Sequence, residues 1–251
     1  MTFFRIVFTI YALIVFVALM LIVFPFALAA MAWGRIKGGN AVYRLCMLWG
    51  DLWFALVFIH IKKIYDAPLN KKNQYIYVAN HISYLDTPVI VKAFRHPLRP
   101  LGKVEMSIIP VFGFIYRNAI VTVDRSSPEN RTESIRILKS IIHKGISVLV
   151  FPEGTFNMTH QPLKEMYNGA FRLAIETQTA LKPVLFLDTF ARMPNTSLFS
   201  LTPGKCRVVY LPEINTEGLT LNNLEELKQQ VARLMSEKLI AYRASWIRSE
   251  S

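Results

Sequence analysis

His81 and Asp86 lie five residues apart, directly after a predicted strand at Tyr75–Ala79. Histidine is the side chain best suited to moving a proton near neutral pH. A carboxylate can hold its other ring nitrogen in one tautomer and stabilise the imidazolium. A five-residue offset on a regular helix separates two side chains by about 140°. The pair can therefore cooperate only if His81 is on a strand-end loop and Asp86 in the following turn. In the alternative, Asp86 caps a helix and His81 is an incidental loop residue.

A second polar turn, Phe151–Thr155, follows the apolar run of a predicted strand. Gly154 permits a close backbone approach, and exposed amides with the Thr155 hydroxyl could hold a polar group of a substrate. Glu153 could accept hydrogen bonds or brace a cation. The alternative is a simple strand-to-loop turn, in which Pro and Gly are expected anyway.

Two cations complete the candidate site. Arg125 follows the predicted strand Ile120–Val123, and Lys103 lies in the preceding block. Arginine can bind a phosphate through two parallel hydrogen bonds, and lysine adds a compact charge. Because single surface cations usually serve solvation, Arg125 at a strand end is the stronger candidate for binding an anionic group.

These residues require a scaffold that brings several strand ends together. Predicted strands lie at Tyr75–Ala79, Ile120–Val123, Ser147–Phe151, Pro183–Leu187 and Cys206–Tyr210. Predicted helices lie at Thr87–Phe94, Asn130–His143, Tyr167–Thr177 and Leu224–Tyr242. Alternation of strands and helices predicts an α/β fold, with a mixed, largely parallel sheet flanked by helices.

The N-terminal segment has a different composition. From Ile6 to Trp33 the sequence contains no Asp, Glu, Lys, Arg or His. As a helix this stretch would be about 42 Å long, against a hydrocarbon core of about 30 Å. It could span with tilt or lie partly in one leaflet. A cleaved signal peptide ending near Ala27–Ala29 is the alternative, but the apolar stretch is longer than such peptides usually have.

A second apolar and aromatic stretch, Ala41–His60, follows. Asp51 in its middle argues against deep spanning, so an amphipathic or re-entrant helix is expected, with a core helix as the alternative. We therefore predict two regions: residues 1–64 form an N-terminal membrane-embedded helical hairpin, and residues 65–251 form the α/β domain.

Composition supports a membrane surface as the partner. Of 251 residues, 53% are hydrophobic and 18% charged, with a net charge of +12. This hydrophobicity excludes an intrinsically disordered chain. Apolar and basic character together favour anionic lipid over nucleic acid, for which no recognisable binding module appears. Lys62 and Lys63 after the apolar region favour a cytoplasmic domain, and Cys46 and Cys206 form no disulfide framework.

Together these segments resemble the glycerolipid acyltransferase family, of the 1-acyl-sn-glycerol-3-phosphate acyltransferase type. Asn80-His81 with Asp86 looks like the family's HxxxxD motif, and Phe151–Thr155 looks like its FPEGT motif. The block from Lys103 to Arg125 resembles the intervening region. HxxxxD alone is unspecific, but FPEGT about 70 residues later makes the combination specific. The resemblance extends from about Tyr75 to the C-terminus, and the N-terminal helices are also similar.

The resemblance implies a membrane-bound O-acyltransferase. It would transfer a fatty acyl group from acyl-CoA or acyl-carrier protein to the free hydroxyl of 1-acyl-glycerol-3-phosphate, giving phosphatidic acid. His81 would be the general base, and Asp86 would orient it and compensate its charge. Lys103, Arg125 and the turn Glu153-Gly154-Thr155 would position the phosphate-bearing headgroup. No cofactor or metal is implied.

The implied partners are a lysophospholipid, an acyl thioester and the bilayer, with acyl-carrier protein as one possible donor. The implied location is the bacterial inner membrane, with the catalytic domain on the cytoplasmic side. Phe156 stands where the family often has Arg, and Phe186 stands in place of a second Pro. These departures leave two alternatives open: an acyltransferase for another lyso-acceptor, such as a lyso-ornithine or glycine lipid, or a non-catalytic lipid-binding membrane protein.

Overall fold

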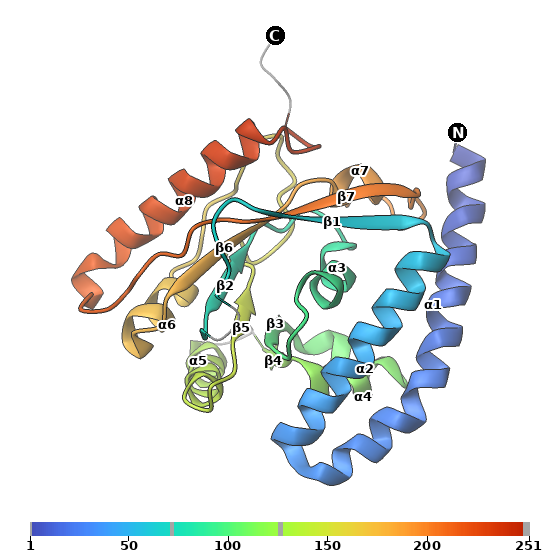
Figure 1. Cartoon of the computed structure of the whole chain (residues 1–251), viewed down its shortest axis with the longest axis horizontal. Helices are drawn as coiled ribbons and strands as arrows, with labels where there is room; N and C mark the ends of the chain where they lie inside the picture. Colours follow the sequence, from blue (N-terminus) through green and yellow to red (C-terminus); the bar gives the residue numbers. More distant parts are fainter. Residues whose placement is uncertain (1, 71–72, 125–127, 248–251) are drawn as a thin grey trace.

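The computed structural model describes residues 2–70, 73–124 and 128–247. In this part of the chain, seven strands form one sheet in the order β1-β7-β6-β2-β5-β3-β4 (Figure 1). All neighbouring strands pair in parallel except β6 and β7, which are antiparallel. The predicted mixed, largely parallel sheet is confirmed. The strands are β1 Ile59–Tyr65, β2 Ile76–Ala79, β3 Arg99–Lys103, β4 Val121–Val123, β5 Val148–Val150, β6 Leu181–Phe186 and β7 Gly204–Tyr210.

Helices cover both faces of this sheet. They are α1 Thr2–Ala30, α2 Gly34–Leu56, α3 Asp86–Ala93, α4 Phe112–Ala119, α5 Pro128–Ile142, α6 Gly169–Thr177, α7 Thr189–Arg192 and α8 Leu224–Ala241, with 3-10 turns η1 Met31–Trp33, η2 Val104–Ile108 and η3 Leu221–Asn223. Strand β2 shows how the faces alternate, since Tyr77 packs with α2 and α3 whereas Val78 packs with α6. The sheet therefore separates two hydrophobic cores.

The predicted elements all have counterparts, and the structure adds others. Each of the five predicted strands and four predicted helices has an element within two residues of its predicted ends. The strands β1 and β3 were not predicted. Strand β1 begins inside the stretch expected to be helical up to His60, and it pairs with β7 from Ile59↔Gly204 to Tyr65↔Tyr210. The helix α2 ends earlier, at Leu56.

The helices α1 and α2 form an antiparallel hairpin at one side of the sheet (Figure 1). The indole Nε1 of Trp53 donates to the Ala12 carbonyl at 2.8 Å, and the ring centroids of Phe16 and Trp49 are 4.4 Å apart. These contacts join the start of α1 to the end of α2. The two helices therefore pack along their length and turn at η1.

The second helix is also part of the domain core. Arg99 at the start of β3 is only 5% exposed, and its Nη2 donates to Asn40 Oδ1 on α2 at 2.9 Å. A Cβ atom on Gly39 would lie 2.7 Å from the same Nη2 and 2.9 Å from the Asn118 carbonyl. Only glycine therefore lets α2 approach β3 and α4 this closely. Because of this packing, α2 lies along the domain rather than projecting from it.

The outer face of the hairpin is apolar. Helical residues Phe3–Leu56 include a window of mean hydropathy 3.1, of which 22% is buried. By length and composition this region could cross a membrane. Its exposed large apolar side chains include Phe4, Ile10, Ile14, Leu21, Ile22, Phe26, Trp33, Leu48 and Leu52.

Candidate active site

The candidate site lies where the parallel strands end. Strands β6, β2, β5, β3 and β4 run in the same direction, so their carboxyl ends meet at one edge of the sheet, here called the carboxyl edge. Val78 of β2 and Val150 of β5 are paired in register, so the loops that follow these two strands begin side by side. His81 and Glu153 each lie three residues beyond this pair. Loops at such an edge are where α/β folds place their binding sites.

The structure brings His81 and Asp86 together. His81 lies on the loop after β2, Asp86 is the first residue of α3, and His81 Nδ1 is 2.9 Å from Asp86 Oδ2. The same carboxylate oxygen accepts the backbone N–H groups of Ile82 and Ser83 at 2.7 and 2.9 Å. Asp86 therefore both folds the turn and orients the imidazole. With Nδ1 engaged, Nε2 is the nitrogen left for a substrate proton.

Aromatic rings fix the plane of the imidazole. The Phe151 ring stacks on His81 at 4.1 Å between centroids with an interplanar angle of 16°, and Phe156 meets it edge-on at 4.4 Å. The Asp86 side chain is fully buried, whereas that of His81 is 17% exposed. The Asp86 carboxylate is thus shielded from solvent, whereas the His81 imidazole is partly accessible to solvent.

Glu153 ties the loop of His81 to the loop after β5. Its Oε1 accepts the backbone N–H of His81 at 2.9 Å, and its Oε2 accepts that of Lys164 at 2.8 Å. The side chain is fully buried. Burial, with a smaller contribution from the nearby Asp86 charge, raises the pKa of Glu153 to about 7, against the lowering effect of the two N–H donors. Glu153 is placed to hold the backbone of His81 rather than to contact a cation.

The rest of the turn presents polar groups outward. Gly154 has φ 73°, a conformation that L-residues rarely adopt. Thr155 is exposed, and its hydroxyl accepts a hydrogen bond from Lys164 Nζ at 2.7 Å. Sequence reasoning missed Lys164, because nothing in its local sequence indicates that the chain folds back to the turn. The Lys164 ammonium group thus lies beside Thr155, the residue before Phe156. Phe156 occupies the position where the resembled family often has an arginine.

The two predicted cations have different outcomes. Lys103 is the last residue of β3, and its side chain is exposed at the carboxyl edge. It pairs in register with Val123 of β4. Arg125 lies outside the described residues. Lys103 therefore lies at the expected edge of the sheet.

Asn80 is a second residue whose role sequence reasoning missed. Its Nδ2 donates to the Phe186 carbonyl at 3.0 Å, and its Oδ1 accepts the Phe186 N–H at 2.8 Å. Asn80 thereby joins the ends of β2 and β6 directly beside His81. A proline at position 186 would lack this N–H, so the departure at Phe186 has a structural use.

The loop after β5 is tied to the loop of His81 at a second point. The Asn157 N–H donates to the His81 carbonyl at 2.8 Å, and the Asn157 carbonyl accepts Asn195 Nδ2 at 3.2 Å. Trp246 Nε1, near the C-terminus, donates to the Gln161 carbonyl at 3.0 Å. The loop that carries Phe156 and Lys164 is thus held from several sides.

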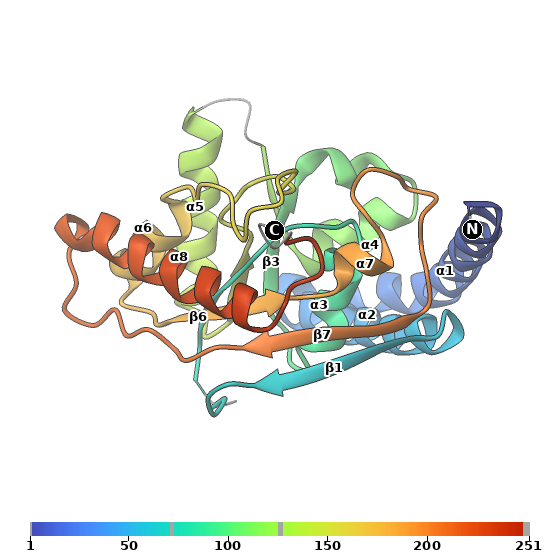
Figure 2. The ribbon, with the colours of Figure 1, turned by 90° about the horizontal axis from the view of Figure 1, so that it is seen from above.

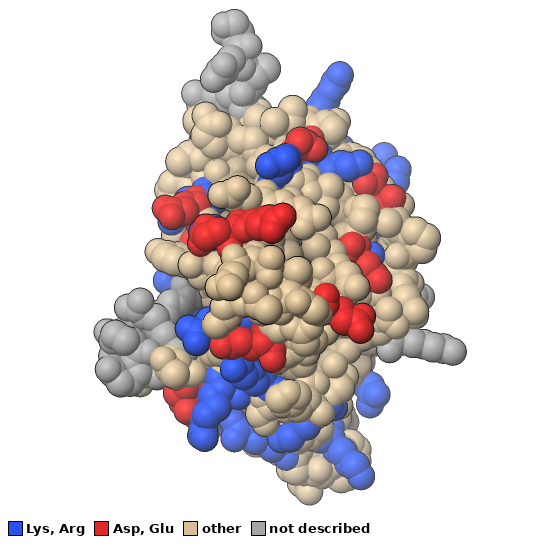
Figure 3. Space-filling model, turned by 90° about the vertical axis from the view of Figure 1, so that its left-hand side faces the viewer, with Lys and Arg blue, Asp and Glu red and all other residues tan. Residues whose placement is uncertain are grey.

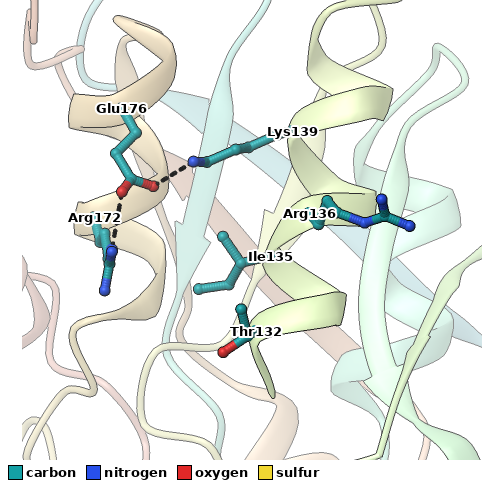
Figure 4. Close-up of a pocket in the computed structure, with 6 residues that line it drawn as sticks. All are labelled: Thr132, Ile135, Arg136, Lys139, Arg172 and Glu176. Carbon is teal, nitrogen blue, oxygen red and sulfur yellow. Dashed lines mark hydrogen bonds and ion pairs between the residues drawn. The ribbon is translucent and has the colours of Figure 1, made fainter. Parts of the chain in front are cut away.

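A pocket of about 310 Å³ lies between α5 and α6 (Figure 4). None of the predicted site residues lines it. Glu176 stands between Lys139 and Arg172, with Lys139 Nζ at 2.8 Å and Arg172 Nε at 2.9 Å (Figure 4). Although burial opposes it, these hydrogen bonds hold the pKa of Glu176 below its usual value. Arg136, which also lines the pocket, pairs instead with Glu133 at 2.9 Å. The pocket contributes no residue to the candidate site. Within the described ranges, no group of three or more His, Cys, Asp or Glu is placed to hold a metal.

Comparisons with known proteins identify the family of this chain. The sequence profile of the family described as Acyltransferase matches residues 60–187, which include the strand ends and both polar turns. A 1-acyl-sn-glycerol-3-phosphate acyltransferase of Limnanthes douglasii is 26% identical over 219 residues, covering 81% of this chain and 75% of the relative. The mouse 1-acyl-sn-glycerol-3-phosphate acyltransferase alpha is 25% identical over 193 residues, covering 72% of this chain and 66% of the relative.

A solved structure has the same fold. The crystal structure of the 1-acyl-sn-glycerophosphate acyltransferase PlsC from Thermotoga maritima aligns with a TM-score of 0.80 and 23% sequence identity. The alignment covers 99% of this chain and 100% of that chain, so it includes the N-terminal hairpin as well as the sheet.

Proposed function

The chain belongs to the acyltransferase family, and we propose that it acylates the free hydroxyl of 1-acyl-glycerol-3-phosphate to give phosphatidic acid. The observation that carries this proposal is the contact of 2.9 Å between His81 Nδ1 and Asp86 Oδ2 at the carboxyl edge. The names of the Limnanthes douglasii and mouse relatives support this acceptor.

The proposed step needs only this dyad and the two substrates. His81 Nε2 removes the proton from the lysolipid hydroxyl as the hydroxyl oxygen attacks the thioester carbonyl carbon. The C–O bond forms, the C–S bond breaks, and the imidazolium returns its proton to the departing thiolate. The buried Asp86 carboxylate stabilises the imidazolium while it exists. The donor is acyl-CoA or acyl-carrier protein, and no acyl-enzyme is required.

Lys164 supports an acceptor with a phosphate headgroup. Its Nζ is 2.7 Å from the Thr155 hydroxyl, so an ammonium and a hydroxyl stand together on the exposed side of the turn. A phosphate can accept hydrogen bonds from both groups. In this chain we therefore assign to Lys164 the positive charge that Phe156 does not supply. Lys103 at the end of β3 adds a second proposed cation, and Arg125 remains a prediction.

We propose that the α1–α2 hairpin holds the enzyme in one leaflet of the membrane. The outer face of α1 is apolar, but α2 packs along the domain through Gly39, Asn40 and Arg99, so the hairpin cannot leave the domain to span alone. An in-plane position satisfies both observations. Lys62 and Lys63 after the helices favour the cytoplasmic side of the bacterial inner membrane as the location of the catalytic domain.

The acceptor is tested with the purified full chain in detergent micelles, an acyl-CoA donor and a panel of lysolipids. We expect phosphatidic acid from lysophosphatidate as the fastest product by mass spectrometry. Faster acylation of a lyso-ornithine or glycine lipid would overturn the acceptor, and no donor consumption with any acceptor would favour a non-catalytic lipid-binding protein.

A variant separates headgroup binding from chemistry in the same assay. Lys164→Met keeps the backbone N–H that Glu153 accepts but removes the ammonium, so KM for lysophosphatidate should rise about tenfold with little change in kcat. Lys228→Met, on α8, is the matched control. An unchanged KM in Lys164→Met would remove this residue from the headgroup site.

A further inference from the structure

The groove between α5 and α6 is rich in positive charge, and the proposed acyl transfer does not use it. Six residues line its pocket: Thr132, Ile135, Arg136, Lys139, Arg172 and Glu176 (Figure 4). Three of them are cations and only one is a carboxylate. Lys144, which is exposed just beyond the end of α5, adds a further positive charge. We call Arg136, Lys139, Lys144 and Arg172 the basic patch.

The cations of the basic patch keep hydrogen-bonding capacity for a partner. The side chains of Arg136 and Arg172 are 80% and 55% exposed. Among the described residues, Arg172 donates only its Nε, to Glu176, which leaves its two terminal nitrogens available. An exposed ion pair contributes little to stability, so Arg136 can exchange Glu133 for an acidic group of a partner at little cost.

The basic patch begins close to the carboxyl edge. Because α5 follows β4 and α6 follows the loop after β5, both helices start at this edge. Arg172 is the fourth residue of α6. The Tyr167 N–H donates to the Pro152 carbonyl at 2.8 Å, which ties the start of α6 to the turn that contains Glu153. A molecule bound along the groove therefore has one end beside the loops of the candidate site.

The groove lies on the face of the sheet that the hairpin does not cover. Ile135 of α5 and Phe171 of α6 pack with Val78 in one core, whereas α1 and α2 belong to the other core. Figure 2 shows α5 and α6 toward the end of the molecule away from α1. A membrane against the outer face of α1 leaves the groove in water. This position favours a water-soluble anionic partner over lipid headgroups.

The lining of the groove suits an acidic protein better than a nucleotide. Nucleotide phosphates are usually held by free backbone N–H groups at a helix N-terminus or a glycine-rich turn. Thr132, the first lining residue of α5, lies beyond the four free N–H groups of a helix start, and the Arg172 N–H already bonds the Asn168 carbonyl at 2.9 Å. The patch therefore offers side-chain charges from two helices, which match a broad acidic surface.

We propose that the basic patch docks acyl-carrier protein, a small acidic protein that presents the acyl thioester. The identity of this partner rests on the proposed function, which requires a thioester donor and leaves its carrier open. The phosphopantetheine arm of the carrier is about as long as five extended residues, roughly 17 Å. The arm passes over the start of α6 toward His81. The donor thus approaches from the face opposite to the hairpin.

The proposal is tested by supplying one acyl group on two donors, acyl-carrier protein and CoA, to the full chain in detergent micelles with lysophosphatidate. In Arg136→Gln/Arg172→Gln, KM for the carrier-protein donor should rise about tenfold with kcat unchanged, because charges at the rim of an interface act on association. Both constants for acyl-CoA should stay unchanged. The control Lys205→Gln/Arg233→Gln removes two exposed cations from β7 and α8 and should alter neither donor's KM.

The kinetic comparison has three outcomes that overturn the proposal. The first is an unchanged KM for the carrier-protein donor in Arg136→Gln/Arg172→Gln. The second is an equal rise for acyl-CoA, because the patch would then act on a part that both donors share. The third is an equal rise in the control variant, which would mean that net charge alone attracts the carrier protein.

Binding of the carrier protein needs no turnover, so it tests the docking even if the acyl transfer fails. Fluorescence anisotropy of a labelled bacterial acyl-carrier protein should show binding to the wild type that weakens from about 0.1 M to about 1 M salt. Binding to Arg136→Gln/Arg172→Gln should be about tenfold weaker at low salt. Absence of binding to the wild type would overturn the proposal. If the variant instead keeps the carrier protein and loses flotation with anionic vesicles, the occupant of the patch is the membrane.

Discussion

At the residue scale, the account depends on a single carboxylate oxygen of Asp86. Its Oδ2 contacts His81 Nδ1 and accepts the N–H groups of Ile82 and Ser83, whereas its Oδ1 is buried without a hydrogen-bond partner among the described residues. An asparagine could keep all three contacts through its carbonyl oxygen and lose only the charge. A substitution at position 86 can therefore test the charge of the carboxylate separately from its contacts with the His81 loop.

We expect Asp86→Asn to lower kcat about a hundredfold with little change in KM, because the imidazolium loses the adjacent negative charge that stabilises it. Steady-state kinetics with lysophosphatidate and acyl-CoA measure this change. Asp66→Asn, whose carboxylate pairs with Lys238 at 2.7 Å, is the control for loss of an ion pair outside the site. Full activity in Asp86→Asn would show that the charge of Asp86 is not used.

Because the pKa of Glu153 is raised in the folded protein, we expect the free energy of unfolding to depend on pH. Burial raises its folded-state pKa from 4.5 to about 7, so the folded protein binds a proton more tightly than the unfolded chain. The resulting stabilisation is complete below pH 4.5 and is lost as the pH rises to about 7, by on the order of 3 kcal/mol. The free energy of unfolding of the wild type should therefore fall, relative to Glu153→Gln, between about pH 5 and about pH 8.

Chemical unfolding in detergent at about pH 5 and about pH 8 measures the difference in free energy of unfolding between the wild type and Glu153→Gln. Glu237→Gln, at an exposed position, is the control. The Glu153→Gln substitution would also place an amide N–H₂ against one of the two backbone donors, so this variant should be less active at both pH values. A pH-independent difference between the wild type and Glu153→Gln would contradict the raised pKa.

The sequence predicted the residues that local spacing can reveal. His81 and Asp86 are five positions apart, so one turn brings them together, and Glu153–Thr155 follow a recognisable strand. Lys164 could not be found in this way, because a loop of irregular backbone returns it to Thr155. Of the two roles predicted for Glu153, accepting hydrogen bonds or bracing a cation, the structure shows the first, since Glu153 accepts two backbone N–H groups. Its two donors, on His81 and on the distant Lys164, could not be identified from the sequence.

At the scale of elements, Asn80 joins two strand ends that are distant in sequence. Asn80→Ala would leave the buried N–H and C=O of Phe186 without partners, so we expect a loss of about 3 kcal/mol in the free energy of unfolding. Thermal unfolding in detergent measures it, and Asn222→Ala, at an exposed position of η3, is the control. An unchanged midpoint would show that β2 and β6 do not depend on this amide.

The amino-acid composition of a strand determines whether it could be predicted from the sequence. The central strands β2, β5 and β6 are fully buried apolar runs, which the sequence displays directly. Strand β1 contains His60, Lys62 and Lys63 because it pairs at the edge of the sheet, and β3 contains Pro100 and Gly102. Their strand conformation comes from pairing with β7 and β5, which no local pattern contains.

At the scale of the whole molecule, the apolar hairpin and the net charge of +12 act together. On the face shown in Figure 3, acidic side chains occupy the middle and Lys and Arg gather toward the end where α5 lies. The positive charge is thus uneven over this face. A membrane carrying anionic lipid should attract such a protein more strongly than a zwitterionic one.

We expect the full chain to transfer from detergent to vesicles containing anionic phospholipid more completely than to purely zwitterionic vesicles. The difference should shrink as salt is raised, because the Debye length falls from about 10 Å at 0.1 M to about 3 Å at 1 M. Flotation of vesicles measures the bound fraction. Equal binding to anionic and zwitterionic vesicles at low salt would contradict this prediction. It would mean that the apolar surface alone attaches the protein to the membrane.

The central claim is that this chain makes phosphatidic acid through His81. Its most direct test is mass spectrometry of lipids from a host whose own lysophosphatidate acyltransferase is conditionally removed, with the wild type, His81→Ala or the control His143→Ala supplied. We predict that the wild type and His143→Ala restore phosphatidic acid, while lysophosphatidate accumulates with His81→Ala at equal protein level. Equal phosphatidic acid from His81→Ala, or no phosphatidic acid from the wild type, would contradict the claim.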